Sequence, residues 1–113
     1  MNIVKNLYSD DNYCKSYKYI LLDKNTELGY LNITINFIKN KSIITDFYCI
    51  KTNNGYGSIL LSYVIDEMKK LKIKSISLDD MTKRYRETHN IYLKYNFKYL
   101  HESGPEMKLI FNH

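Results

Sequence analysis

The clearest pattern in the chain is an alternation of apolar and polar side chains between residues 31 and 37. The apolar positions are Leu31, Ile33, Ile35 and Phe37, and the polar ones are Asn32, Thr34 and Asn36. This period of two predicts a strand with one buried face. Apolar runs over residues 17–22 and 43–50 flank it, with polar turns at 23–25 and 40–42. The run at 43–50 is apolar on both faces, which is typical of a central strand. The three segments predict an antiparallel meander.

The period changes in the second half of the chain. The apolar positions over residues 58–71 are Leu60, Leu61, Val64, Met68 and Leu71, and this spacing predicts an amphipathic helix. A short strand over 73–78 follows, so we expect a right-handed crossover and a parallel strand pair. A second helix is predicted over 84–95, and two strands over 97–101 and 106–111. Residues 1–16 are harder to read, although Ile3 and Val4 suit a short strand or turn.

These elements predict an α/β fold with a mixed sheet, in a single domain over residues 1–113. No run approaches about 18 apolar residues, so we expect no membrane span. Residues 1–10 lack a signal-peptide core, which favours an intracellular, cytoplasmic protein. Cys14 and Cys49 are too few for a disulfide scaffold, and no spacing of cysteine or histidine suggests a metal site.

The net charge is +5, from 17 basic and 12 acidic residues. The lysines are spread along the chain, apart from a cluster at residues 69–74, and such a spread is typical of a solvated surface. Charge alone therefore does not demand an anionic partner.

The abundance of tyrosine, asparagine, isoleucine and lysine fits a gene of AT-rich codons, as in some large DNA viruses.

Residues 52–58, with the sequence TNNGYGS, join the predicted central strand directly to the predicted helix. Gly55 and Gly57 allow positive φ and a close approach of the backbone to a ligand. The amides of the first helical turn have no partners inside the helix, so this segment can form a nest for a phosphate. A tight turn with a glycine near the cap would explain the same residues. The segment is neither a P-loop nor a complete GxGxxG, because Leu60 holds the third position.

Three segments together resemble the GNAT superfamily of acyl-CoA N-acyltransferases. Strand residues 46–50 followed by GYGSILL are similar to its motif A, commonly [QR]xxGxG before a helix. Residues 90–97, NIYLKYNF, are similar to its motif B, commonly LYxKxGF, and residues 106–109 to the strand that follows it. Thr52 stands where the family favours Gln or Arg, and Asn96 replaces a glycine. Asparagine tolerates the left-handed conformation, so the helix can still end at Asn96.

The resemblance implies that acetyl-CoA lies between two splayed parallel strands, with no metal. Its pyrophosphate would lie on the amides of Asn53, Asn54, Gly55, Tyr56, Gly57 and Ser58. Its pantetheine arm would follow Tyr48, Cys49 and Ile50 as an added strand, and an N–H near Cys49 or Ile50 would polarise the thioester. Asn90 and Lys94 are further candidates for cofactor binding, and Lys94 could equally be solvated.

The resemblance assigns Tyr92 as the acid that protonates the leaving thiolate, since tyrosine is neutral at pH 7 and can donate. An ordinary helix aromatic is the other interpretation of Tyr92. Asp46 is the candidate base, because a carboxylate in a mostly apolar strand needs a reason. Asp79 and Asp80 are rival bases, and His89 is a weaker one. Cys49 has no identifiable activating neighbour and is a poor candidate nucleophile.

The sequence thus favours an N-acetyltransferase (EC 2.3.1) that acts on a primary amine, on a protein lysine or a small molecule. The N-terminal segment is shorter than the helix pair that usually covers the family's acceptor site, and a homodimer is an open expectation. A CoA-binding domain without turnover is one alternative. A small basic module for single-stranded nucleic acid is another. The latter needs exposed aromatic residues between lysines on one sheet face, and the strand at 31–37 carries Asn and Thr instead, so a nucleic-acid partner is not favoured.

Overall fold

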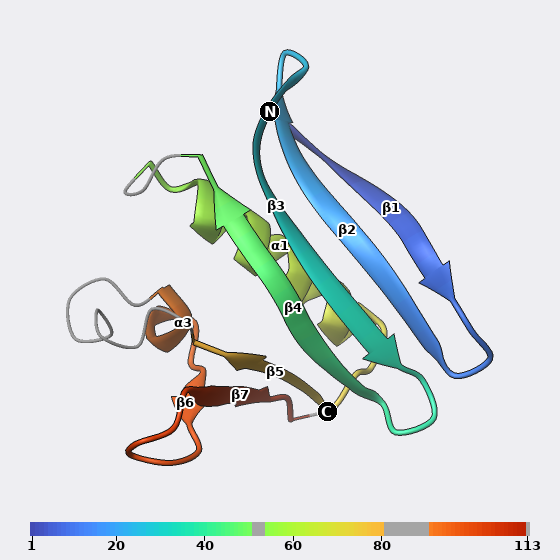
Figure 1. Ribbon diagram of the computed structural model, residues 1–113, viewed down its shortest axis with the longest axis vertical. Coiled ribbons are helices and arrows are strands. Elements are labelled where there is room, and N and C mark those ends of the chain that lie inside the picture. The colour runs from blue at the N-terminus through green and yellow to red at the C-terminus, as the bar shows by residue number, and fades with distance from the viewer. Residues whose placement is uncertain (51–53, 81–90, 113) are drawn as a thin grey trace.

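The computed structural model of the chain describes residues 1–50, 54–80 and 91–112. Within these residues, seven strands form one mixed sheet in the order β1-β2-β3-β4-β5-β7-β6 (Figure 1). The elements are β1 (Asn2–Asp10), β2 (Cys14–Asp23), β3 (Thr26–Asn36), β4 (Lys41–Cys49), α1 (Tyr56–Lys70), β5 (Ser75–Asp79), α3 (Ile91–Lys94), β6 (Lys98–Tyr99) and β7 (Glu106–Ile110). The predicted α/β class and mixed sheet are confirmed.

Strands β1 to β4 form an antiparallel meander, as the alternating pattern predicts. Lys24 and Asn25 connect β2 to β3 with φ of 50° and 71°, the conformation of a tight hairpin turn. On β3, the side chains of Leu31, Ile33 and Ile35 are completely buried. Most side chains of β1 are exposed. A strand with so little burial has no apolar period, so the sequence did not predict its full length.

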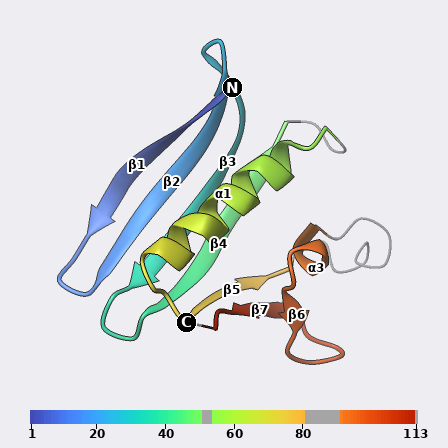
Figure 2. The same ribbon diagram turned by 180° about the vertical axis from the view of Figure 1, so that it is seen from behind.

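Helix α1 packs across one face of the meander, over β2, β3 and β4 (Figure 2). Its buried side chains are Leu60, Leu61, Val64, Ile65 and Met68. Strand β5 then returns parallel to β4, so the predicted strand–helix–strand unit and its parallel pair are confirmed. Among the described residues, no helix has the length and hydrophobicity needed to cross a membrane.

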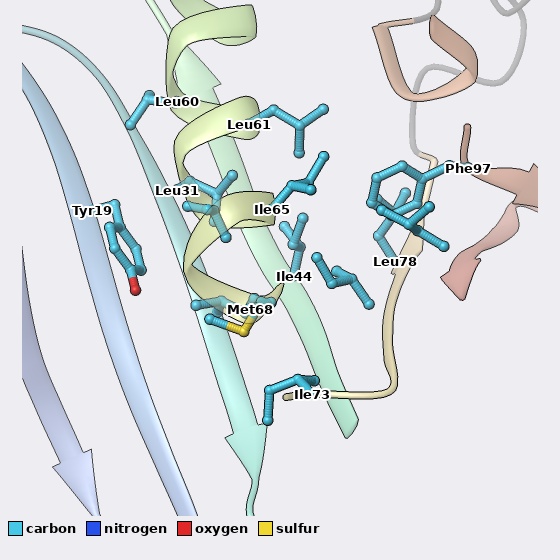
Figure 3. Packing of buried hydrophobic residues seen from close by; sticks show 14 of the residues in the cluster. Tyr19, Leu31, Ile44, Leu60, Leu61, Ile65, Met68, Ile73, Leu78 and Phe97 are labelled. Atoms are coloured by element: carbon cyan, nitrogen blue, oxygen red, sulfur yellow. The ribbon is translucent and has the colours of Figure 1, made fainter. Parts of the chain in front are cut away.

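The core lies between α1 and the sheet and extends to the C-terminal strands. It contains Tyr19 from β2, Leu31 from β3, Met68 from α1 and Phe97, which precedes β6 (Figure 3). The other face of β4 is open. Ile43 and Tyr48 on that strand are 46% and 53% exposed. The strand over residues 43–50 is thus central in the sheet but is not buried on both faces, contrary to its apolar pattern.

The second predicted helix, over residues 84–95, is described only from Ile91 onward, and residues 84–90 lie outside the described part of the chain. The helix ends at Asn96, whose φ is 73°, and the amide of Phe97 donates to the carbonyl of Tyr92 at 3.1 Å. The expected left-handed asparagine is therefore confirmed. The two last strands, β6 and β7, are shorter than predicted.

Candidate active site

Strands β4 and β5 separate soon after they begin to pair. Their parallel pairing covers only Lys41 to Ile43 on β4, although β4 continues to Cys49. Each strand keeps its other neighbour: β4 stays paired with β3 as far as Cys49, and β5 with β7 as far as Asp79. Figure 1 shows the two ribbons diverging from the parallel pair. The facing edges of β4 and β5 therefore carry backbone groups that do not bond to each other.

A β-bulge at Thr45 changes the direction of the side chains along β4. Ile33 pairs with Ile44 and Asn32 with Asp46, so Thr45 is an extra residue without a partner on β3. Beyond a bulge a strand bends and its alternation shifts by one residue. Ile44 and Phe47 consequently both pack toward the core, and Asp46 lies on the open face. This shift explains why the sequence of the strand shows no clean alternation.

The backbone of Cys49 points into the gap between the two strands. The amide of Ile50 donates to the carbonyl of Leu28 on β3 at 3.0 Å, so it is not available to polarise a thioester. Bonded and non-bonded residue pairs alternate along an antiparallel ladder, and Cys49 lies opposite Gly29 in the next pair. The N–H and C=O of Cys49 are therefore directed away from β3. Of the two amides expected near this point, the geometry favours that of Cys49.

Gly29 on β3 allows Cys49 to lie this close. A Cβ on Gly29 would lie 2.7 Å from the carbonyl oxygen of Tyr48 and 2.8 Å from Sγ of Cys49. No real side chain has contacts this short, so only glycine fits. The Cys49 thiol itself is half-buried on the α1 side, and burial raises its pKa. The higher pKa agrees with the view that Cys49 is not a nucleophile.

Helix α1 begins at Tyr56, with residues 50–55 between it and the end of β4, and its first amides lack helical partners. Gly55 precedes it with φ of 79°, and the first helical bond runs from the amide of Ile59 to the carbonyl of Gly55 at 3.1 Å. The amides of Tyr56, Gly57 and Ser58 come before that bond, and no side chain of the described residues caps the helix start. A Cβ on Gly55 would meet no atom of the described residues within 4 Å, so this part of the structure leaves space beside Gly55. Such amides at a helix start can bind an anion, and their role as the pyrophosphate site stays a prediction.

Gly57 has a different role from Gly55. A Cβ on Gly57 would lie 3.2 Å from Cδ1 of Ile91 and 3.5 Å from Cζ of Phe47. This glycine thus lets the first turn of α1 pack against β4 and α3. Asn54 is exposed at the start of the loop, and Asn53 and Asn90 lie outside the described residues.

A row of aromatic rings crosses from β4 to the C-terminal part of the chain. The rings of Phe47 and Tyr92 are 6.2 Å apart, and those of Tyr92 and Phe97 are 5.8 Å apart. Burial raises the pKa of Tyr92 well above its usual value, and the nearby carboxylates of Asp80 and Asp46 raise it further. The Tyr92 hydroxyl therefore stays protonated at neutral pH, within electrostatic range of both β4 and the end of β5.

The candidate bases differ in their surroundings. Asp46 is exposed on the open face, where its Oδ2 accepts a hydrogen bond from the hydroxyl of Tyr30 at 2.8 Å and its Oδ1 one from the amide of Phe47 at 2.9 Å. Asp79 is exposed, whereas Asp80 is 1% exposed and accepts a hydrogen bond from the hydroxyl of Tyr99. Asp80 is thus enclosed, and Asp46 remains accessible to water and to an incoming amine. His89 lies outside the described residues.

Tyr30 is a site residue that sequence reasoning missed. Its ring lies 6.0 Å from that of Tyr48, and its hydrogen bond to Asp46 raises its pKa. The only sequence signal was its place on the polar face of β3, two residues before Asn32. Lys94, at the end of α3, is exposed and lines a groove with other lysines. Among the described residues, no group of three or more potential metal ligands gathers, and absence of a metal stays a prediction.

No protein-family model matches the chain, and no curated protein matches it in sequence. Solved structures do match in fold. An acetyltransferase from Bacillus cereus ATCC 14579 has a TM-score of 0.71 at 16% identity, over 87% of this chain and 74% of that one. The PaiA N-acetyltransferase from Thermoplasma acidophilum, in complex with coenzyme A, has a TM-score of 0.64 at 20% identity, over 88% and 62% of the chains.

A third match is a GNAT family acetyltransferase from Brucella melitensis, in complex with acetyl-CoA. Its TM-score is 0.66 at 11% identity, over 86% of this chain and 59% of that one. Two of these three structures thus hold CoA or acetyl-CoA. At such identities the likeness concerns the fold.

Proposed function

We propose that this chain, which has the fold of the GNAT acetyltransferases, transfers an acetyl group from acetyl-CoA to a primary amine on a protein lysine or a small molecule. The observation that carries the proposal is the edge of β4 near Cys49. Its backbone groups face a gap in the sheet, and the strand leads within a few residues to the uncapped start of α1. A long thiol carrier that ends in a diphosphate needs both features side by side.

Acetyl-CoA binds in this proposal with its pyrophosphate on the amides of residues 53–58. Its pantetheine arm extends along residues 48–50 and bonds to the backbone of β4 as an added strand. The N–H of Cys49 then donates to the thioester oxygen, where negative charge develops as the amine attacks. These roles belong to main-chain groups. They therefore do not depend on the side chain at position 52, where this chain has Thr52 and the family favours Gln or Arg.

The acceptor amine approaches from the open face of the sheet, where Asp46 lies. An alkylammonium group has a pKa near 10.4, so it must lose a proton before it attacks. Asp46 takes this proton, directly or through a water molecule, while the Tyr30 hydroxyl and the Phe47 amide hold its carboxylate in place. The tetrahedral intermediate then collapses with cleavage of the C–S bond, and Tyr92 donates its proton to the leaving thiolate of CoA. The proton that the attacking nitrogen loses as it becomes an amide returns to Tyr92 through water.

Two measurements test the proposal together. Calorimetric titration with CoA should show one binding site, and thiol release from acetyl-CoA should depend on an added primary amine. The Asp46→Asn variant should bind CoA like the native protein, whereas its kcat should fall and lose its rise with pH. A protein that binds no CoA contradicts the whole proposal. An unchanged pH profile in Asp46→Asn contradicts only the role of Asp46.

A further inference from the structure

Exposed lysines gather at the end of the molecule where β4 begins. They come from the β3–β4 turn with the first residue of β4, and from the end of α1 with the residues before β5, and they are Lys39, Lys41, Lys69, Lys70, Lys72 and Lys74. The amide of Lys74 donates to the carbonyl of Asn40 at 2.7 Å, so the two segments lie side by side, as Figure 2 shows. Residues 37–41 and 69–74 together form what we call the basic end.

The basic end has no neutralising carboxylates of its own. Residues 36–42 and 68–75 contain no aspartate or glutamate. Within the part of the chain that the structure describes, none of these lysines forms an ion pair with a carboxylate. Two of them lie in the last turn of α1, where they suit the negative end of the helix dipole, but the others lie outside the helix. The adjoining β1–β2 turn carries Asp10 and Asp11, which limit the basic surface on that side.

Apolar side chains lie among these lysines and are exposed. Phe37, Ile38 and Leu71 are 39%, 64% and 41% exposed, and none of them belongs to the packed core of the described residues. The side chain of Asn36 fixes the β3–β4 turn, because its Oδ1 accepts from the amides of Ile38 and Lys39 at 3.1 and 3.0 Å. Leu71 lies directly between two of the lysines. The fold thus presents apolar groups to solvent in turns that are surrounded by positive charge.

We infer that the basic end binds the surface of a membrane that contains anionic lipid. Clusters of lysine are attracted to the negative headgroups of such a membrane, and apolar side chains beside them can enter the boundary between headgroups and acyl chains. The lysines would lie at the headgroups, with Phe37, Ile38 and Leu71 below them. A contact of this kind lies on the bilayer and needs no spanning segment.

The aliphatic side chains favour a membrane over other anionic partners. A nucleic acid would use the lysines and stack on a ring, but it has no use for Ile38 or Leu71. The central part of a protein–protein interface is depleted in lysine, whereas here lysines adjoin each aliphatic side chain in sequence. Anionic headgroups above an apolar layer match both components of the basic end.

The basic end is far from the proposed active site. Strand β4 has nine residues and runs from Lys41 at the basic end to Cys49 at the gap in the sheet. At about 3.3 Å per residue, these two points lie roughly 26 Å apart. Figure 1 shows the start and the end of this strand at opposite ends of the meander. The inference therefore does not depend on the proposed function, and a bound membrane would leave the gap open to CoA.

Co-sedimentation with vesicles tests the role of the lysines, over a series of salt concentrations. The protein should partition at least tenfold more strongly onto vesicles of phosphatidylcholine with phosphatidylserine than onto phosphatidylcholine alone, and salt should reduce this preference. The double variant Lys39→Gln/Lys74→Gln should weaken the partition about 25-fold, since each lysine near an anionic surface contributes about fivefold. The matched control Lys5→Gln/Lys98→Gln removes the same charge from the edge strands β1 and β6 and should stay within about twofold of the native value.

Tryptophan fluorescence tests the apolar contact, because the chain has no tryptophan of its own. The emission of Ile38→Trp should move to shorter wavelength when anionic vesicles are added. The control Ile59→Trp changes a residue that is 38% exposed in the first turn of α1, at the other end of that helix, and its emission should not move. Ile38→Ser should weaken the partition about threefold with an unchanged salt dependence, because it removes apolar surface and no charge.

Several outcomes would overturn the inference. Equal losses in the two double variants would show unspecific attraction of a basic protein, and an unmoved emission of Ile38→Trp on bound vesicles would show that the turn stays outside the bilayer. Tighter binding to poly-glutamate or oligo(dT) than to the vesicles, with native affinity in Ile38→Ser, would assign the basic end to an acidic protein or a nucleic acid instead. Circular dichroism confirms the fold of each variant, and Lys41→Gln/Lys72→Gln replaces the first double variant if that one unfolds. None of these measurements requires acetyl transfer.

Discussion

The two sides of β4 differ in how far they are bonded. Toward β3, the strand makes eight residue pairs, which run from its first residue to its last. Toward β5 it makes three, all at its beginning. The fully bonded side adds stability to the meander, and the other side leaves main-chain groups for a ligand. We therefore expect substitutions on the β3 side of β4 to change mainly the free energy of unfolding. Substitutions on the β5 side should change mainly the rate of acetyl transfer.

The largest effect on stability should come from the bonded side. Leu31 on β3 lies opposite Phe47 and is completely buried. Leu31→Ala leaves a cavity in the core and should lower the free energy of unfolding by about 2–5 kcal/mol, measured by urea denaturation. The kcat per folded molecule should hardly change. A large loss of kcat in molecules that remain folded would show that the two sides of β4 are coupled.

On the unbonded side, Cys49→Pro should remove a donor without breaking the β3 ladder. The amide of Cys49 points into the gap, and loss of one such donor typically costs about 10²–10³ in kcat. Cys49→Ala keeps the amide and serves as the control for the lost thiol. Thiol-release kinetics on both variants measure the difference. If proline and alanine give equal rates, the amide does not stabilise the transition state.

Tyr92→Phe should reduce kcat by about tenfold to a hundredfold and leave CoA affinity unchanged, because it removes only the proton donor. Since burial raises the pKa of Tyr92, its hydroxyl stays protonated at pH 10, where an ordinary tyrosine is half ionised. The native rate should therefore show no decline near pH 10 from loss of this proton. If Tyr92→Phe keeps the native kcat, Tyr92 is not the acid, and its ring only packs against those of Phe47 and Phe97.

The smallest effect should come from Tyr19, whose hydroxyl is buried in the core without a hydrogen-bond partner in the described structure. Burial raises its pKa, so above pH 10 the unfolded chain releases a proton that the folded chain retains. Stability is then complete below pH 10 and falls as the pH rises further. Tyr19→Phe should stabilise the protein by about 1 kcal/mol at pH 7 and weaken this alkaline loss.

Urea denaturation at pH 7 and at pH 10.5 measures both effects, with Tyr63→Phe as the control. Tyr63 lies beside Tyr19, with ring centroids 5.9 Å apart, and is 40% exposed. Its substitution should leave the alkaline loss in place. Destabilisation by Tyr19→Phe at pH 7 would mean that the hydroxyl has a partner after all.

The elements with a strong apolar period were predicted well from the sequence. The buried face of β3 and the helix over residues 58–71 follow directly from spacing, and the parallel return of β5 follows from the crossover. Strand β1 could not be predicted at full length, since exposed strands have no such period. The described part of α3, Ile91–Lys94, has a placement that depends on tertiary contacts more than on local pattern.

The backbone features of the candidate site were easier to read from the sequence than the contacts of its side chains. The free amides at the start of α1 were readable from Gly55 and Gly57, which lie where the predicted strand joins the predicted helix. The bulge at Thr45 was not, because an extra residue depends on the register between two strands. That bulge places Asp46 on the open face next to Tyr30, so the partner of the candidate base could not be found from spacing.

Beyond their short parallel pairing, β4 and β5 have backbone groups that do not bond to each other, in the middle of the sheet. An unpaired strand edge is a template for any extended chain, including a second copy of the same protein. The edges of β4 and β5 are such templates wherever nothing lies between them. We expect the ligand-free protein to self-associate and to scatter more light at high concentration, and CoA to suppress this association by covering the edge of β4.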